Sequence, residues 1–335
     1  MTMRGMLLLH SLLVAIAVAG IAIAHRGAMS VSQLVTLFLV TTSFVSIVGR
    51  VAEQLPELQA GLGAVIRLRQ MMAVEPEPRG GAPVPAGQLD LTFRDLRFSY
   101  AEGTFALEHV DLHLPAGRTL ALVGRTGSGK STLASLVSRA VDPEPGTVLL
   151  GGIDVLDLDL EDLRRSVGVV TQRTEILAGT LGENIALFAD VERSRLEEVV
   201  DELGLGAWVE ALDDGLDTRL GPGGASLSAG EEQLVAFARL LLRDVQLVVL
   251  DEATARMDPV TEARVVAASD RLLRDRTGIL VAHRLSTIAR ADDVAALEGG
   301  RLVQHGPRAE LAVVEGPFSE LLRSATEESA PAKDT

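Results

Sequence analysis

The stretch that decides the fold is residues 119–132, Thr-Leu-Ala-Leu-Val-Gly-Arg-Thr-Gly-Ser-Gly-Lys-Ser-Thr. The apolar run at 120–123 predicts a buried strand, and a glycine-rich segment follows it directly, before a helical pattern begins. Such a loop binds phosphate, because its N–H groups point inward beside the positive end of the helix dipole. Lys130 is expected to reach the outer phosphates, and the Ser131 hydroxyl is expected to bind Mg²⁺.

The scarcity of lysine supports this interpretation over an ordinary glycine-rich turn. Of the 31 basic residues, only Lys130 and Lys333 are lysines. The motif needs a compact ammonium at position 130, and lysine stands there in a chain whose basic residues are otherwise almost all arginine. Chance is a poor explanation for that placement.

Composition excludes several classes of protein. The chain has 335 residues, a formal net charge of −15 and no cysteine, and its six histidines show no zinc-ligand spacing. Without cysteine there is no disulfide, thiolate chemistry or cysteine-based metal site. The acidic balance argues against a nucleic-acid partner, because phosphate neutralisation needs clustered arginine and lysine.

Two apolar stretches at the start of the chain predict a membrane hairpin. Residues 6–24 and 31–48 are each long enough to cross the hydrocarbon core, and only a short loop separates them. Basic residues after the second stretch place its exit on the cytoplasmic side. A cleaved signal peptide is the alternative for the first stretch, and the second stretch argues against it.

The second apolar stretch carries a polar stripe at helical spacing. Its members are Ser32, Thr36, Ser43, Ser46, Arg50 and Gln54. The stripe fits a translocation path, and it fits equally well the close packing of membrane helices through small residues.

After residue 88 the pattern is that of an α/β domain. We expect strands at 89–93, 96–100, 110–114, 147–150, 166–170 and 279–282, and a helix over 192–212. The apolar run 245–250 ends in Asp251 and Glu252, which places two carboxylates at the edge of a parallel sheet. Asp251 is expected to hold Mg²⁺ and Glu252 to polarise the attacking water as general base. Two solvated acids ending a strand are the alternative.

Three further positions are weak signals when taken alone. Tyr100 suits the stacking of a base, although a tyrosine at a strand end is more often packed. Ser228 and Gly230 precede a helix over 231–242 and are typical of an ordinary N-cap, which also offers a helix N-terminus to an anion.

Together these residues resemble the ATP-binding cassette (ABC) transporters of the exporter type, over residues 6 to about 322. The resemblance implies an α/β P-loop NTPase with a mixed sheet core, an antiparallel β subdomain and a helical subdomain, preceded by an α-helical transmembrane hairpin. Residues 1–74 are then a partial transmembrane domain, with its helix continuing to about 73. Residues 75–88 form a linker, 89–324 the ABC ATPase domain and 325–335 a disordered tail.

The resemblance also implies the site. It assigns ATP binding to Tyr100, Gly124, Arg125, Thr126, Gly127, Ser128, Gly129, Lys130, Ser131, Thr132, Gln172, Ser228, Gly230 and Asp258. It assigns Mg²⁺ binding to Ser131, Gln172 and Asp251. It assigns catalysis to Glu252, His283, Lys130 and Gln172. Two such domains close head to tail, each ATP lying between the phosphate loop of one and Ser228 and Gly230 of the other. The partner is a second half-transporter in the cell membrane, with the ATPase domains in the cytoplasm.

The chain departs from the family pattern in several places. Ala229 and Glu231 stand where Gly and Gln are usual in the signature motif, and Pro222 stands where exporters often have Glu. Residues 255–258 read Ala-Arg-Met-Asp rather than the common Ser-Ala-Leu-Asp. We expect hydrolysis to survive these changes and the coupling to the membrane domain to be more affected.

The number of membrane helices is the larger departure. Exporter halves of this kind carry six spans and this chain supplies two, so we expect an N-terminally shortened half that binds ATP but does not transport alone. A misplaced start, a split gene and gene decay each account for this, and an upstream reading frame encoding four spans would support it.

Two other functions are the alternatives. One is a membrane-anchored ATPase that does not transport and regulates a partner chain. The other is a chromosome-maintenance ATPase, which the roughly 100 ordinary residues between the phosphate loop and Ser228 argue against. Sequence leaves open the transported substrate and whether the dimer joins identical or different halves.

Overall fold

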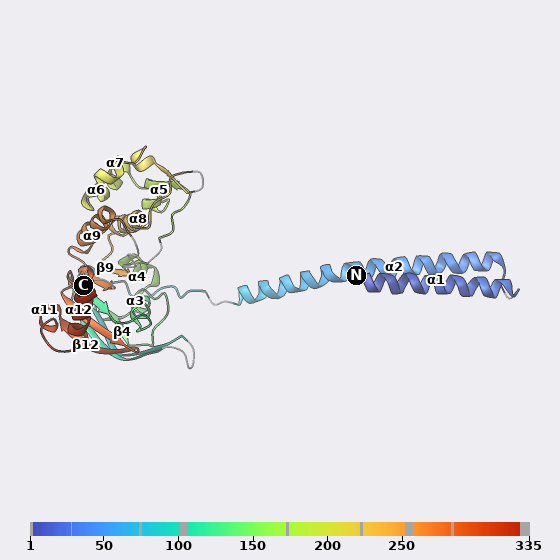
Figure 1. Cartoon of the computed structure of the whole chain (residues 1–335), viewed down its shortest axis with the longest axis horizontal. Helices are drawn as coiled ribbons and strands as arrows, with labels where there is room; N and C mark the ends of the chain where they lie inside the picture. Colours follow the sequence, from blue (N-terminus) through green and yellow to red (C-terminus); the bar gives the residue numbers. More distant parts are fainter. Residues whose placement is uncertain are drawn as a thin grey trace, which may run out of the picture. The chain divides into compact units, whose positions relative to one another are not determined.

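The computed structural model describes residues 3–27, 29–73, 76–100, 106–171, 174–221, 224–251, 257–282 and 285–328. The chain forms two compact units, Met1–Glu77 and Pro78–Thr335, which are described separately (Figure 1).

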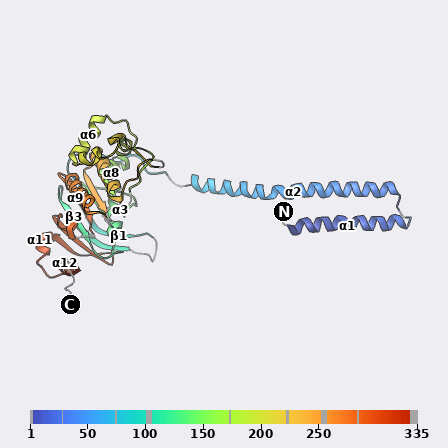
Figure 2. The ribbon, with the colours of Figure 1, turned by 45° about the horizontal axis from the view of Figure 1, so that its top comes forward.

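The first unit is a pair of helices, α1 (Met3–His25) and α2 (Val31–Met72), which lie side by side (Figure 2). Ser30 starts α2 with a capping box: its hydroxyl accepts the Gln33 N–H at 3.3 Å, and the Gln33 side chain accepts the Ser30 N–H at 2.9 Å. Among the described residues, α2 alone is long and apolar enough to cross a membrane. Within α1, the part Leu13–His25 is a shorter apolar helical segment.

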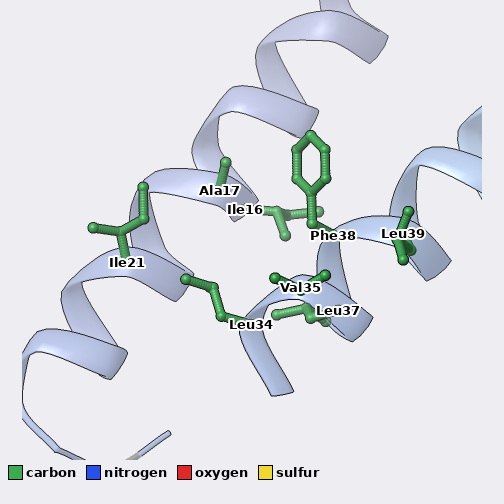
Figure 3. A pocket seen from close by; sticks show the side chains of 8 residues that line it. All are labelled: Ile16, Ala17, Ile21, Leu34, Val35, Leu37, Phe38 and Leu39. Atoms are coloured by element: carbon green, nitrogen blue, oxygen red, sulfur yellow. The ribbon is translucent and has the colours of Figure 1, made fainter. Parts of the chain in front are cut away.

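Between the two helices lies an apolar cavity of about 300 Å³ (Figure 3). It is lined by Ile16, Ala17, Ile21, Leu34, Val35, Leu37, Phe38 and Leu39. Along α2, the hydroxyls of Thr36, Thr41 and Thr42 donate to main-chain carbonyls one turn earlier, at 2.8–2.9 Å. These polar groups are therefore satisfied within the helix itself, as an apolar environment requires.

The second unit is built around a six-stranded mixed sheet of order β12-β11-β3-β10-β9-β6. Its strands are β3 (Thr119–Val123), β6 (Val167–Val170), β9 (Leu247–Asp251), β10 (Thr277–Val281), β11 (Asp293–Glu298) and β12 (Arg301–Pro307). All neighbours are parallel except β11 and β12. The apolar residues of β3, β9 and β10 are buried, as expected for strands covered on both faces.

A four-stranded antiparallel sheet of order β2-β1-β4-β5 packs against it through a shared apolar core. Its strands are β1 (Leu91–Ser99), β2 (Ala106–Leu114), β4 (Val148–Leu150) and β5 (Ile153–Asp154). A small ribbon pairs β7 (Gly179–Thr180) with β8 (Arg219–Leu220). The mixed core and the antiparallel subdomain confirm the fold class expected from the sequence.

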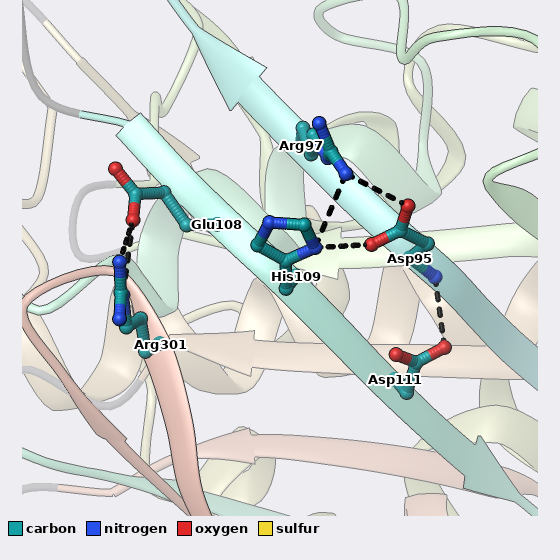
Figure 4. Close-up of polar contacts among 6 residues, drawn as sticks. All are labelled: Asp95, Arg97, Glu108, His109, Asp111 and Arg301. Atoms are coloured by element: carbon teal, nitrogen blue, oxygen red, sulfur yellow. Dashed lines mark hydrogen bonds and ion pairs between the residues drawn. The ribbon is translucent and has the colours of Figure 1, made fainter.

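The prediction of two separate strands at 89–93 and 96–100 was wrong, because β1 runs through both. The break in the pattern is a bulge at Asp95, whose φ is +43° and whose N–H donates to Asp111 at 2.8 Å (Figure 4). On β2, His109 also has a positive φ, and its ring Nδ1 lies 2.5 Å from the Asp95 carboxylate. The bulge lets Asp95 contact Asp111 and His109 on the partner strand, and β1 continues past it.

Helices complete the second unit. Those outside the helical subdomain are α3 (Lys130–Val137), α4 (Leu160–Ser166), α9 (Pro259–Leu273), α10 (Leu285–Ile288), α11 (Arg308–Leu311) and α12 (Pro317–Glu328). The helical subdomain holds α5 (Leu181–Ala186), α6 (Arg193–Glu202), α7 (Gly206–Glu210), a 3₁₀ turn (Gly215–Asp217) and α8 (Ala229–Leu242). The single helix predicted over 192–212 was wrong, because Gly204 with φ +66° divides it into α6 and α7. Helix α12 runs four residues into the segment expected to be a disordered tail.

Part of the expected linker is bound to the second unit. Ala82 forms a parallel bridge beside Leu158: its N–H donates to Asp157 O at 2.8 Å, and its carbonyl accepts the Asp159 N–H at 2.8 Å. The Val84 N–H donates to the Asp162 carboxylate at 3.0 Å. The chain is thus fixed to α4 several residues before the first strand begins.

Candidate functional site

The candidate site lies at the carboxyl edge of the parallel strands. Strand β3 runs directly into the glycine-rich loop, and β9 ends at Asp251, two strands away across β10. Ligands of open parallel sheets bind at this edge, because the loops that follow the strands converge there.

The glycines of the loop are required by its backbone. Gly124 has φ +144°, and a Cβ there would lie 2.2 Å from the Leu297 carbonyl oxygen. Gly127 and Gly129 have φ +81° and +109°, a region that other residues adopt at a cost. The loop therefore curls tightly against the end of β11 and turns its backbone into the first turn of α3.

Lys130 is held inside this loop. Its side chain is buried, with 4% of the residue exposed, and Nζ donates to Gly124 O at 2.8 Å and to Arg125 O at 3.1 Å. Burial lowers the pKa of the Lys130 ammonium below its ordinary value, although the Asp251 carboxylate opposes that shift. A desolvated cation whose hydrogen-bond partners in the described part of the chain are two neutral carbonyls is well suited to exchange them for a phosphate.

Ser131 and Asp251 meet beside the lysine. Ser131 Oγ donates to Asp251 Oδ2 at 3.4 Å, which joins the start of α3 to the end of β9. Asp251 Oδ1 and Ser128 Oγ are buried atoms with no hydrogen-bond partner among the described residues. Unsatisfied buried oxygens are costly, so the donor set fits a nucleotide phosphate with a hard divalent cation such as Mg²⁺.

The signature segment starts α8 with a capping box. Ser228 is the N-cap, and both its N–H and its hydroxyl donate to Glu231 Oε2, each at 2.8 Å. The other oxygen, Oε1, accepts the indole N–H of Trp208 in α7 at 3.0 Å. Gly230 lies inside the first turn, and a Cβ there would lie 2.3 Å from Thr261 Cγ2 and 3.1 Å from Met257 Sδ. Gly230 is therefore a packing residue as well as a candidate for nucleotide contact.

Asp258 and Tyr100 have local partners of their own. Asp258 caps α9 and accepts the Val260 and Thr261 N–H groups, each at 3.0 Å. Hydrogen bonding from Thr261 is the main cause that lowers the pKa of the Asp258 carboxyl. Tyr100 is 58% exposed, and its ring meets that of Phe98 edge to face with the centroids 5.0 Å apart. Base stacking on Tyr100 stays a prediction.

Three of the residues expected to carry the chemistry, Gln172, Glu252 and His283, lie outside the described residues, as does Pro222. Their roles stay predictions. Lys130, Ser131 and Asp251 are brought together by the fold, whereas Ser228 and Gly230 belong to the separate face formed by α8.

Two residues of the site have no signal in a single sequence. Trp208 contacts Glu231, which lies 23 positions later in the chain. The Ser-x-x-Glu capping pattern points to Glu231, but nothing in the sequence points to Trp208. Arg239 of α8 donates to the carbonyls of Asn184 and Glu175 at 2.8 and 3.0 Å, which ties α8 to the segment following Gln172. Burial lowers the pKa of this guanidinium.

Comparison with known proteins gives a consistent picture. Residues 107–255 match the family described as ABC transporter. The ATP-dependent lipid A-core flippases of Vibrio parahaemolyticus serotype O3:K6 and of Yersinia pestis are 38% and 39% identical over 271 and 273 residues. Each alignment covers 80% of this chain and 47% of the relative. The chain thus spans about half the length of these curated relatives.

One solved structure resembles the chain over almost its whole length. A bacterial Atm1-family ABC exporter with ATP bound superposes with a TM-score of 0.72 and 27% sequence identity. The match covers 98% of this chain and 57% of the exporter. Both units of the chain therefore have counterparts in an exporter architecture.

Proposed function

The chain belongs to the ABC transporter family, and on that premise we propose that it is the ATP-binding and ATP-hydrolysing part of an exporter. ATP-driven dimerisation of two nucleotide-binding domains would be coupled to export of a substrate across the membrane. The observation that carries the proposal is the buried Lys130 ammonium beside the Ser131–Asp251 pair, at the carboxyl edge of the sheet.

The chain's own residues divide the work. Lys130 exchanges its two carbonyl partners for phosphate oxygens of ATP, and the loop N–H groups hold the remaining phosphates. Ser131 and Asp251 would hold Mg²⁺, which neutralises the charge of the phosphates when it is bound. Glu252, next in the chain to Asp251, is the proposed general base for the attacking water, with Gln172 and His283 completing the site.

The proposed partner is a second ABC half-transporter that supplies further membrane helices. Ser228 and Gly230 at the start of α8 would face the ATP held by that partner, because the N-terminus of a helix suits a phosphate. The protein would lie in the cell membrane as a multi-pass chain with its ATPase domain in the cytoplasm. Its curated relatives are named as lipid A-core flippases, so amphipathic lipids are the first substrates to test.

The test compares the parent with three variants of the full chain in lipid nanodiscs. Lys130→Ala should lose ATP binding, measured with a fluorescent ATP analogue, and Lys333→Ala, which removes the other lysine, should not. Glu252→Gln should keep binding but lose about 10²–10⁴-fold in hydrolysis, the usual contribution of a general base. Unchanged binding and turnover in Lys130→Ala would refute the proposal. A parent as inactive as Glu252→Gln would instead favour a regulatory, non-transporting subunit.

A further inference from the structure

In the first turn of α8, donors that a phosphate would need are already paired within the chain. A helix N-terminus presents free N–H groups, and at a signature motif these groups and the serine hydroxyl are the donors that a phosphate needs. Here the Ser228 N–H and the Ser228 hydroxyl both donate to one oxygen of Glu231, each at 2.8 Å. The two donors are therefore already engaged by an anion of the same chain.

Glu231 is itself fixed from its other side. Trp208 Nε1 donates to Oε1 at 3.0 Å, so both carboxylate oxygens have partners, and Trp208 is 4% exposed. Burial raises the pKa of Glu231, but the hydrogen bonds from Ser228 and Trp208 outweigh it and leave the pKa below its ordinary value. Glu231 is thus ionised at neutral pH.

A carboxylate and a phosphate need the same donors. The Ser228 hydroxyl has a single proton, and it is donated to Glu231, so a phosphate can receive it only after that bond has broken. The charges of the two anions also repel each other when they approach the same donor. A glutamine at this position would keep the capping box through its carbonyl oxygen but would carry no charge.

We propose that Glu231 is an intramolecular competitor of ATP at the signature face, holding Ser228 until the phosphate of a partner-bound ATP displaces it. This inference rests on the proposed function, since it concerns the same nucleotide sandwich. Glu231 is a positioning residue here: it acts on ATP through Ser228. The consequence is that the signature face engages ATP only at higher nucleotide concentration than the phosphate loop alone would require.

Trp208 provides a direct readout, because it is the only tryptophan of the chain and donates to Glu231 itself. Displacement of the carboxylate from Ser228 should change the environment of the indole. In the parent chain, a slowly hydrolysed ATP analogue should therefore shift the Trp208 emission, with a half-maximum at the concentration at which the signature face engages.

The decisive comparison is Glu231→Gln against Glu232→Gln in the full chain. The control removes the same charge one residue later, from a carboxylate that, among the described hydrogen bonds, accepts none from Ser228. Glu231→Gln should lower the nucleotide concentration at half-maximal emission change and at half-maximal ATPase rate by several-fold to about tenfold, the usual difference between a charge-assisted and a neutral hydrogen bond. Glu232→Gln should leave both concentrations at the parent value.

The outcomes separate the hypotheses. Equal half-maximal concentrations in the two variants, or a higher one in Glu231→Gln, would overturn the competitor role. Urea melts followed by circular dichroism report the capping role separately, because loss of the cap lowers stability without lowering the nucleotide requirement. If Lys130→Ala binds ATP as the parent does, the proposed function fails; if only the Glu231 comparison fails, the nucleotide site stands without its competitor.

Discussion

Substitution of Gly230 by alanine tests whether the signature glycine is needed for packing. A Cβ at this position would lie 2.3 Å from Thr261 Cγ2 and 3.1 Å from Met257 Sδ. Carbon atoms pack best at about 3.5–4.0 Å, so α8 and α9 would have to separate by more than about 1 Å. Methionine is flexible and can move aside, whereas Thr261 is buried and branched.

The expected loss of stability follows from two opposing contributions. Overpacking a core contact costs about 1–3 kcal/mol, and alanine recovers up to about 1 kcal/mol over glycine through helix propensity. Gly230→Ala should therefore lower the free energy of unfolding by about 1–2 kcal/mol. Thr261→Ser removes only the clashing methyl group and should cost about 0.8 kcal/mol on its own.

The double variant is the informative one. In Gly230→Ala/Thr261→Ser the new methyl group occupies the space of the one removed, so stability should return to within about 0.5 kcal/mol of the parent. Independent effects would instead sum to a loss of about 2–3 kcal/mol. Urea unfolding followed by Trp208 emission measures this, because Trp208 belongs to the same apolar cluster as α8.

Turnover of the double variant then separates packing from chemistry. The added Cβ would point at Thr261 and leave the N–H groups of the helix start unaltered, so ATP hydrolysis should recover together with stability. A Gly230→Ala chain as stable as the parent, or a double variant that sums the two losses, would refute the packing argument. A stable but inactive double variant would place the need for glycine at the nucleotide.

Two further predictions concern the phosphate loop and the bound segment before the domain. Lys130→Met should abolish the nucleotide-dependent rise in stability, about 2.7 kcal/mol at 100 Kd, in a thermal melt. Because burial lowers the pKa of Lys130, the parent should gain stability as pH rises through that lowered pKa toward 10.5, and Lys130→Met should not. Gly81→Ala would place a Cβ 2.5 Å from Asp159 N and should speed tryptic cleavage after Arg79 several-fold. Gly80→Ala, at φ +82° but with nothing within 4 Å, adds backbone strain without a clash and should speed cleavage less.

The phosphate-loop side of the site could be predicted because its signals are local. An apolar run, three glycines and a lysine fix a strand, a turn and a helix start within one short stretch, and Asp251 ends another apolar run. Parallel strands bring such ends to one edge of a sheet whatever the intervening chain does. The Ser131–Asp251 contact at 3.4 Å across 120 positions lies at the edge that this rule predicts.

Contacts that depend on tertiary placement could not be predicted in this way. The polar pair before Leu96 looks like a turn, and only the partner strand, through Asp111, shows that Asp95 is a bulge in a continuous strand. The pairing of Trp208 with Glu231 joins two helices of the helical subdomain. No periodicity encodes either contact, because each one arises from packing between segments distant in sequence.

On both faces of the proposed nucleotide sandwich, acceptors of the chain occupy the donors for phosphate, but the charge of those acceptors differs. On each face the donors meant for phosphate are occupied by acceptors of the chain itself: Lys130 by two neutral carbonyls, and Ser228 by the charged Glu231. Binding of ATP is then an exchange of acceptors on both sides. At Lys130 an anionic phosphate replaces neutral carbonyls, which strengthens the bonds of the ammonium, whereas at Ser228 one anion only replaces another. ATP should therefore bind the phosphate loop first, and the signature face should follow only when the partner domain presents its phosphate.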